Sequence, residues 1–119
     1  MSPDDLIRLH HMAEAARTAM RFCQGREQHD LDSNTMLRMA LLHAVLIIGK
    51  AAARVSDAGR AAAPGVEWPV IVGMRNRRVH AYIDVNTEIL WKTVMLSLSA
   101  LLQQLEAVDG VASTNPSEG

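Results

Sequence analysis

The chain has 119 residues, of which 49% are hydrophobic and 21% are charged, and its formal net charge is -1. This length suits a single domain, and the apolar fraction excludes wholesale disorder. The single cysteine excludes an internal disulfide, and no basic segment leads into an apolar run near Met1, so we expect a cytoplasmic protein without a secretory signal. Seventeen alanines against four aromatic residues favour an all-α fold, because alanine has the highest helix propensity.

A first helix is predicted by apolar or small residues spaced by three and four positions, which fall on one stripe of a helix. The stripe consists of Leu6, Leu9, Ala13, Ala16, Met20 and Cys23. Residues 24–32 are polar and contain a glycine, which predicts a connection. Ser33 or Asn34 can then cap a second helix.

The second helix is apolar on nearly every side from Met36 to Ile48. Such a helix must be covered by the rest of the bundle, by a partner subunit or by both. Its longest apolar run, Met39 to Gly49, falls well short of the roughly 20 residues that a membrane span needs. We therefore expect a core helix and no association with a membrane.

Glycine and proline residues punctuate residues 59–69 and predict a loop. Residues 70–85 allow two interpretations. Alternating apolar residues from Val79 to Val85 favour a β-hairpin, but an isolated hairpin is marginal in water and nothing else in the chain offers a third strand. We therefore prefer a helix for this segment.

A last long helix is predicted to start near Asn86 or Thr87. Its apolar stripe consists of Leu90, Val94, Leu98, Leu101 and Leu105. The residues that follow are small, polar and proline-containing, so we expect a helical domain of residues 1–108 and a flexible tail of residues 109–119.

Charge is distributed unevenly along the chain. Residues 50–80 carry a net charge of +4, whereas residues 81–119 carry -4. The basic excess coincides with residues 75–80, Arg-Asn-Arg-Arg-Val-His, which place three guanidinium groups beside one imidazole. A cluster of this kind attracts phosphate groups, although a run of charge is more often a solvated surface.

His80 adds a chemical role to this cluster. In a helix, Asn76 and His80 share a face, so the amide could hold one ring nitrogen, whereas Arg75 needs its long side chain or a second subunit to reach the imidazole. An imidazole can take a proton from a ribose 2′-hydroxyl or return one to a leaving 5′-oxygen, while guanidinium stabilises charge on the phosphate. These are the components of a metal-independent ribonuclease, but a single histidine is more often a structural hydrogen-bonding residue.

Residues 75–82, Arg-Asn-Arg-Arg-Val-His-Ala-Tyr, resemble the Arg-Asn-x-x-x-His-x-Tyr motif of HepT, the toxin of prokaryotic MNT–HepT toxin–antitoxin pairs in the HEPN superfamily. Similarity continues in the same order through residues 47–56, 64–68, 71–74 and 85–91. The resemblance implies an antiparallel HEPN-type bundle of four to five helices that forms a homodimer. It further implies that Arg75 and His80 of both protomers line a cleft at the interface.

The resemblance also implies a function, an endoribonuclease toxin of a type II/VII-like pair that leaves 2′,3′-cyclic phosphate ends. Arg75 and His80 would be catalytic with Asn76 in support, and the cluster assigns phosphate binding to Arg77 and Arg78. A cognate MNT nucleotidyltransferase would neutralise the toxin and transfer AMP to Tyr82. ATP and magnesium would belong to that partner, and we expect neither a metal nor another cofactor in this chain.

Two alternatives stay open at this point. The chain could be a non-catalytic HEPN partner or substrate of a nucleotidyltransferase, or a structural helical adaptor. Without the resemblance, Tyr82 would be interpreted as a half-buried ring with a hydrogen-bonded hydroxyl.

Three further side chains are weaker candidates. His10 and Glu14 lie one helical turn apart and could share a metal, but with no third ligand a surface pair is the better interpretation. His43 lies in the apolar second helix and is expected to be a core or interface histidine. Cys23 falls on the core stripe of the first helix and is expected to behave as a small hydrophobic residue.

Overall fold

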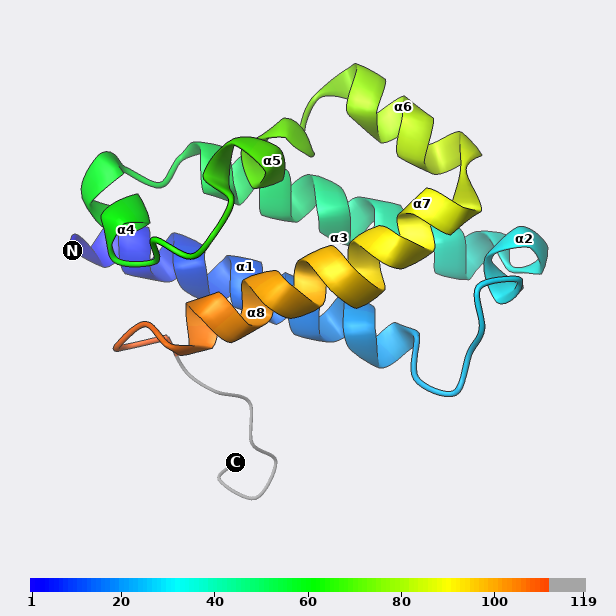
Figure 1. Ribbon diagram of the computed structural model, residues 1–119, viewed down its shortest axis with the longest axis horizontal. Coiled ribbons are helices and arrows are strands. Elements are labelled where there is room, and N and C mark those ends of the chain that lie inside the picture. Colours follow the sequence, from blue (N-terminus) through cyan, green and yellow to red (C-terminus); the bar gives the residue numbers. More distant parts are fainter. Residues whose placement is uncertain (112–119) are drawn as a thin grey trace.

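A computed structural model describes residues 1–111 of the chain, and these residues are all-α, with no strand among them (Figure 1). In chain order the elements are α1 (Pro3–Phe22), α2 (Asp30–Ser33), α3 (Thr35–Ala53), α4 (Asp57–Ala61), α5 (Trp68–Gly73), α6 (Arg77–Val85), α7 (Thr87–Lys92), the π-helical segment η1 (Thr93–Leu98) and α8 (Ser99–Glu106). The predicted fold class is confirmed, and the β-hairpin considered for residues 70–85 is wrong.

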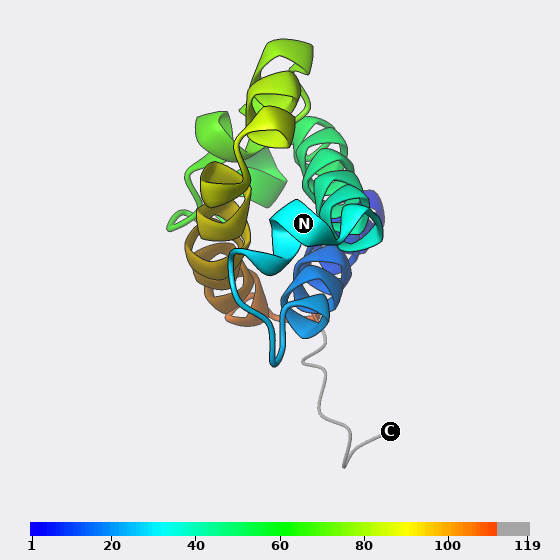
Figure 2. The same ribbon diagram turned by 90° about the vertical axis from the view of Figure 1, so that its right-hand side faces the viewer.

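Three long helical segments form the body of the fold. α1 and α3 run antiparallel beside each other, and α7, η1 and α8 follow one another as a single continuous rod that packs against α1 (Figure 1). Viewed from the end, α6 lies above α3 at the edge of the molecule (Figure 2). This leaves one side of α3 in contact with the core and another side open.

Polar caps begin most of the helices. The side chain of Asn34 accepts a hydrogen bond from Leu37 N at 3.0 Å, and that of Asn86 accepts one from Ile89 N at 3.2 Å. Each cap satisfies one of the backbone N–H groups that the first turn of a helix leaves unpaired. Of the two caps considered for the second helix, the structure uses Asn34, and the predicted start of the last helix is confirmed.

The predicted apolar stripes form the core. Its fully enclosed residues include Leu9, Ala13 and Ala16 of α1, Leu41, Val45 and Ile48 of α3, and Leu90, Val94, Leu98 and Leu105 of the last rod. Met12 and Ala19 are also fully buried, so the buried face of α1 is wider than the predicted stripe. By length and composition α3 could also cross a membrane, and a core helix of a bundle meets the same criterion.

Three local features differ from the prediction. The helix expected over residues 70–85 is broken at Met74–Asn76 into α5 and α6. Short helices α2 and α4 occupy segments predicted as connection and loop. The last rod contains the π-helical turn η1, where Thr93 Oγ1 donates to Ile89 O at 2.7 Å and competes with the regular backbone ladder.

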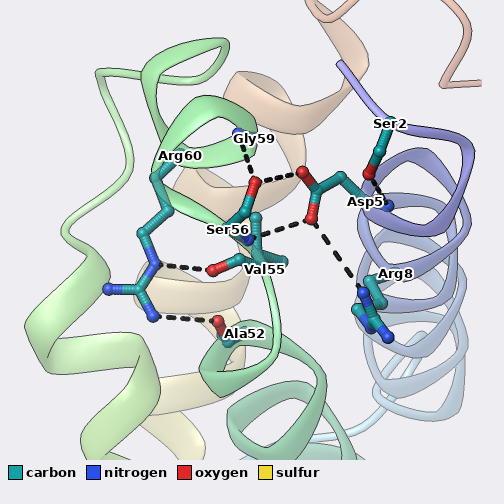
Figure 3. A network of polar contacts seen from close by, with 8 residues as sticks. All are labelled: Ser2, Asp5, Arg8, Ala52, Val55, Ser56, Gly59 and Arg60. Atoms are coloured by element: carbon teal, nitrogen blue, oxygen red, sulfur yellow. Dashed lines mark hydrogen bonds and ion pairs between the residues drawn. The ribbon is translucent and has the colours of Figure 1, made fainter.

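Asp5 ties the start of α1 to the start of α4 (Figure 3). Its buried carboxylate accepts hydrogen bonds from Ser56 N at 2.9 Å and from Ser56 Oγ, and Arg8 lies 4.0 Å away. The backbone and hydroxyl donors of Ser56 lower the pKa of Asp5 below its ordinary value of 3.8. This contact closes the end of the bundle at which α1 begins.

At the other end of the chain, Val111 is buried, three residues beyond the predicted domain limit at 108. The remainder of the predicted flexible tail, residues 112–119, lies outside the described residues.

Candidate functional site

Helix α6 carries most of the candidate residues, and its start is fixed by Asn76. The amide oxygen of Asn76 accepts a hydrogen bond from Arg78 N at 2.9 Å, which caps the helix. Ile83 is the buried residue of α6 and anchors the helix to the body of the fold. The prediction that the Asn76 amide holds the His80 ring is wrong, because the His80 ring forms no hydrogen bond within residues 1–111.

Arg75 lies in the short connection between α5 and α6, directly against α3. At Gly49 of α3, an added Cβ would lie 2.6 Å from Arg75 N and 3.0 Å from the carbonyl carbon of Met74. Both of these are backbone atoms, which cannot move away without shifting the connection. The absence of a side chain at Gly49 therefore allows Arg75 to occupy its position.

His80 is half-buried in a groove of about 390 Å³ between α6 and α3. The other lining residues are Arg38, Met39, Leu42, His43, Leu46 and Asp84. Nδ1 of His80 is enclosed and has no hydrogen-bond partner within residues 1–111. An enclosed Nδ1 leaves Nε2 as the ring nitrogen that can meet a ligand.

The three arginines of the cluster, Arg75, Arg77 and Arg78, are all exposed. In the described part of the chain, none of their guanidinium groups forms an ion pair or a hydrogen bond. Other arginines are engaged: Arg38 Nε lies 3.8 Å from Asp84 Oδ1, and Arg60 donates to the backbone carbonyls of Val55 and Ala52 (Figure 3). The cluster is thus a concentration of uncompensated positive charge, which suits a polyanion.

Tyr82 is 59% exposed, and its hydroxyl has no hydrogen-bond partner among residues 1–111. The half-buried, hydrogen-bonded tyrosine considered as an alternative is therefore wrong. Two residues correspond to about 200° around a helix, so Tyr82 projects from the opposite side of α6 to His80. Arg78 precedes Tyr82 by four residues and shares its face.

The weaker candidates differ in their burial and in the groove that they line. His10, Glu14 and His43 line a second groove of about 610 Å³ between α1 and α3, and the described residues contain no group of three or more metal-ligating side chains. His43 is exposed in the single chain, which contradicts a place in its core, whereas the expected place at a subunit interface stays a prediction. Cys23 is buried as predicted, and burial raises the pKa of its thiol.

Sequence reasoning missed two residues that shape this region. Gly49 supports Arg75, and its only signal was a glycine inside a strongly predicted helix, which often marks a close approach of another backbone. Asp84 pairs with Arg38 across the groove of His80, and no sequence spacing connects residues that are so far apart in the chain.

Comparison with known proteins adds to this geometry. The ribonuclease HepT-like family matches residues 12–108. A protein of Methanocaldococcus jannaschii named a putative RNase is 29% identical over 100 residues, covering 84% of this chain and 92% of the relative. A protein of Thermococcus cleftensis named a probable ribonuclease HepT is 28% identical over 98 residues, covering 82% and 89%.

A third relative, from Caldanaerobacter subterraneus subsp. tengcongensis and named a putative RNase, is 26% identical over 100 residues, covering 84% of this chain and 89% of the relative. No solved structure matches the chain significantly. The family match spans most of the described residues and includes the whole of α6 with its arginine cluster and His80. This chain therefore belongs to the HepT-like ribonuclease family.

Proposed function

We propose that the protein is a metal-independent endoribonuclease in which Arg75 and His80 act on one phosphodiester. The observation that carries the proposal is a cluster of unpaired guanidinium groups within five residues of His80, whose Nε2 is left for a ligand, in a chain of the HepT-like ribonuclease family. Arg77 and Arg78 bind neighbouring phosphates as point contacts along the RNA.

The chemistry follows from these groups. The ribose 2′-oxygen attacks the adjacent phosphorus, a proton leaves the 2′-hydroxyl, and the bond from phosphorus to the 5′-oxygen breaks as that oxygen receives a proton. The products are a 2′,3′-cyclic phosphate and a 5′-hydroxyl. His80 transfers a proton, and the guanidinium of Arg75 stabilises the negative charge that grows on the phosphoryl oxygens. Asn76 supports the site by fixing the start of α6.

A homodimer completes the proposal. Exposed apolar residues gather on the open side of α1 and α3, namely Ile7, Phe22, Met36, Met39 and Ile47. Met36 is 84% exposed and Met39 is 62% exposed, which a monomer in water would not favour. A second copy covering this face would place the groove of His80, which Met39 also lines, at the edge of the interface.

Light scattering tests the dimer. We expect Met36→Glu to weaken the dimer. Leu96→Glu should leave the dimer intact, because Leu96 is an exposed apolar residue outside this face.

We further propose that the protein is the cytoplasmic toxin of a toxin–antitoxin pair, neutralised by a cognate MNT nucleotidyltransferase. The accessible hydroxyl of Tyr82 supports modification: its oxygen attacks the α-phosphorus of ATP, pyrophosphate leaves, and the hydroxyl proton goes to solvent. ATP and magnesium belong to the transferase. The adduct adds a negative charge beside Arg78 and obstructs RNA.

Incubation of the purified protein with cellular RNA in EDTA tests the proposal. We expect fragments with 2′,3′-cyclic phosphate ends, and loss of most cleavage in Arg75→Ala and in His80→Ala. His29→Ala is the matched control, because His29 is an exposed histidine in the connection between α1 and α2. Equal cleavage by wild type and His80→Ala would refute the catalytic assignment.

The exposure of Tyr82 also favours a second candidate, a non-catalytic substrate of a nucleotidyltransferase. In that case no RNA is cleaved, but partner and ATP add the mass of AMP to the chain. Tyr82→Phe removes this mass increase. RNA cleavage by the unmodified protein would exclude this second candidate.

A further inference from the structure

His43 occupies an unusual position for a residue of the apolar helix α3. It is exposed, and it lines both the groove of His80 on one side and the groove facing α1 on the other. Its imidazole forms no hydrogen bond or ion pair within residues 1–111. A core role and a hydrogen bond within the protomer therefore do not account for this side chain. His43 lies one helical turn from both Met39 and Ile47 of the proposed dimer face, so a second copy would also lie beside it.

The packing of α6 on α3 sets His43 and His80 at the same level. Asp84 pairs with Arg38 at 3.8 Å near the start of α3, whereas the Arg75 backbone touches Gly49 near its end. The two segments are therefore antiparallel. His80 lies one helical turn before Asp84, which corresponds to one turn after Arg38 on α3, the turn that contains Leu42 and His43.

The two charged side chains that line this groove pair with each other, whereas the two imidazoles have no partner within residues 1–111. Arg38 and Asp84 face each other across it. On the far side of His43, helix α1 contributes His10, His11 and Glu14 to the groove between α1 and α3. These three residues do not line the groove of His80. His43 and His80 are thus the two imidazoles that line the groove between α3 and α6.

We propose that His43 is a second catalytic histidine of the same protomer, an inference that rests on the proposed ribonuclease function. Transesterification of RNA moves two protons, one from the 2′-hydroxyl and one to the departing 5′-oxygen. One imidazole accepts the first while the other, in its protonated form, delivers the second, so the pair ends with its protonation states exchanged. Two histidines facing one phosphodiester accomplish this in a single turnover.

The pH dependence of RNA cleavage tests the role of His43. We expect wild type to show a bell-shaped profile with two titrating limbs, and both His43→Ala and His43→Gln to lose one limb and about 100-fold or more in rate. His11→Ala is the matched control, because His11 is exposed and does not line the groove of His80. Leu46→Ala controls for the shape of the groove, because it changes a lining residue that cannot titrate and that lies outside the proposed dimer face.

The outcomes separate this inference from the proposed function. If wild type cleaves RNA and His43→Gln keeps both limbs at the wild-type rate, His43 is not catalytic, and the second proton-transfer group lies elsewhere, such as the second copy. If wild type cleaves no RNA, the ribonuclease proposal itself fails, and the role of His43 fails with it. Unchanged thermal unfolding of the His43 variants will show that a lost limb is not a folding defect.

Discussion

Gly49→Ala should displace the candidate catalytic arginine without touching a charged group. The added Cβ would lie 2.6 Å from Arg75 N, whereas ordinary van der Waals contact begins at 3.4 Å, so the connection must shift by about 0.8 Å. Overpacking of this kind costs about 1–3 kcal/mol, and the better helix propensity of alanine returns about 0.5–1 kcal/mol. We expect a net loss of about 1–2 kcal/mol in the free energy of unfolding.

Two measurements follow from this displacement. Thermal unfolding monitored by circular dichroism should show a Tm about 4–8 °C lower, given the size of the domain. RNA cleavage should fall about 100-fold, because a shift near 1 Å in a positioned group has an effect of that order. Gly73→Ala is the matched control, because a Cβ there meets nothing within 4 Å. A Gly49→Ala protein with wild-type Tm and wild-type cleavage would refute the packing argument.

Three further predictions concern stability and reactivity. Because the pKa of Asp5 is lowered in the folded protein, its carboxylate stabilises the fold above pH 3.8, and this contribution is lost as the pH falls through the lowered pKa. Asp5→Asn should therefore lower the Tm at pH 7. The difference in Tm between this variant and wild type should shrink in acid. Trp68→Phe removes the indole N–H that donates a hydrogen bond to Ala63 O at 3.1 Å, and it should lower the free energy of unfolding in urea by about 1–3 kcal/mol. Trp91→Phe is the control, because the half-buried indole of Trp91 has no such hydrogen bond within the described residues. The Cys23 thiol, buried and with a raised pKa, should react slowly with a disulfide reagent in native protein and rapidly in urea; fast native reaction would contradict its burial.

Much of the helical architecture was predictable because its determinants are local. The spacing of apolar residues in α1 and in the last rod identified faces that are buried in the structure, including Leu9 and Leu98. The caps at Asn34 and Asn86 were predictable for the same reason, since a cap needs only a short polar side chain before a helix. The family resemblance was also local, because it depends on a short motif and its neighbouring segments.

Other features depended on contacts between distant residues. The break between α5 and α6 reflects the close approach of the Arg75 backbone to Gly49, and no periodicity within residues 70–85 signals it. The Asp5 carboxylate meets Ser56 across 51 positions of sequence, so its burial was not predicted. The apolar neighbours of His43 predict a core or interface histidine, but the open side of α3 leaves it exposed in the single chain.

Local patterns and short motifs were therefore sufficient to predict the fold class, the main helices and the candidate residues Arg75, His80 and Tyr82. These properties depend on composition, on periodicity and on residues that are close along the chain. Three features of the site come from the folded chain: Asn76 caps α6 and does not hold His80, Tyr82 lies on the side of α6 opposite to His80, and His43 shares a groove with His80. The physical reason is that side-chain direction and groove composition are set by how helices pack, through contacts that no local pattern encodes.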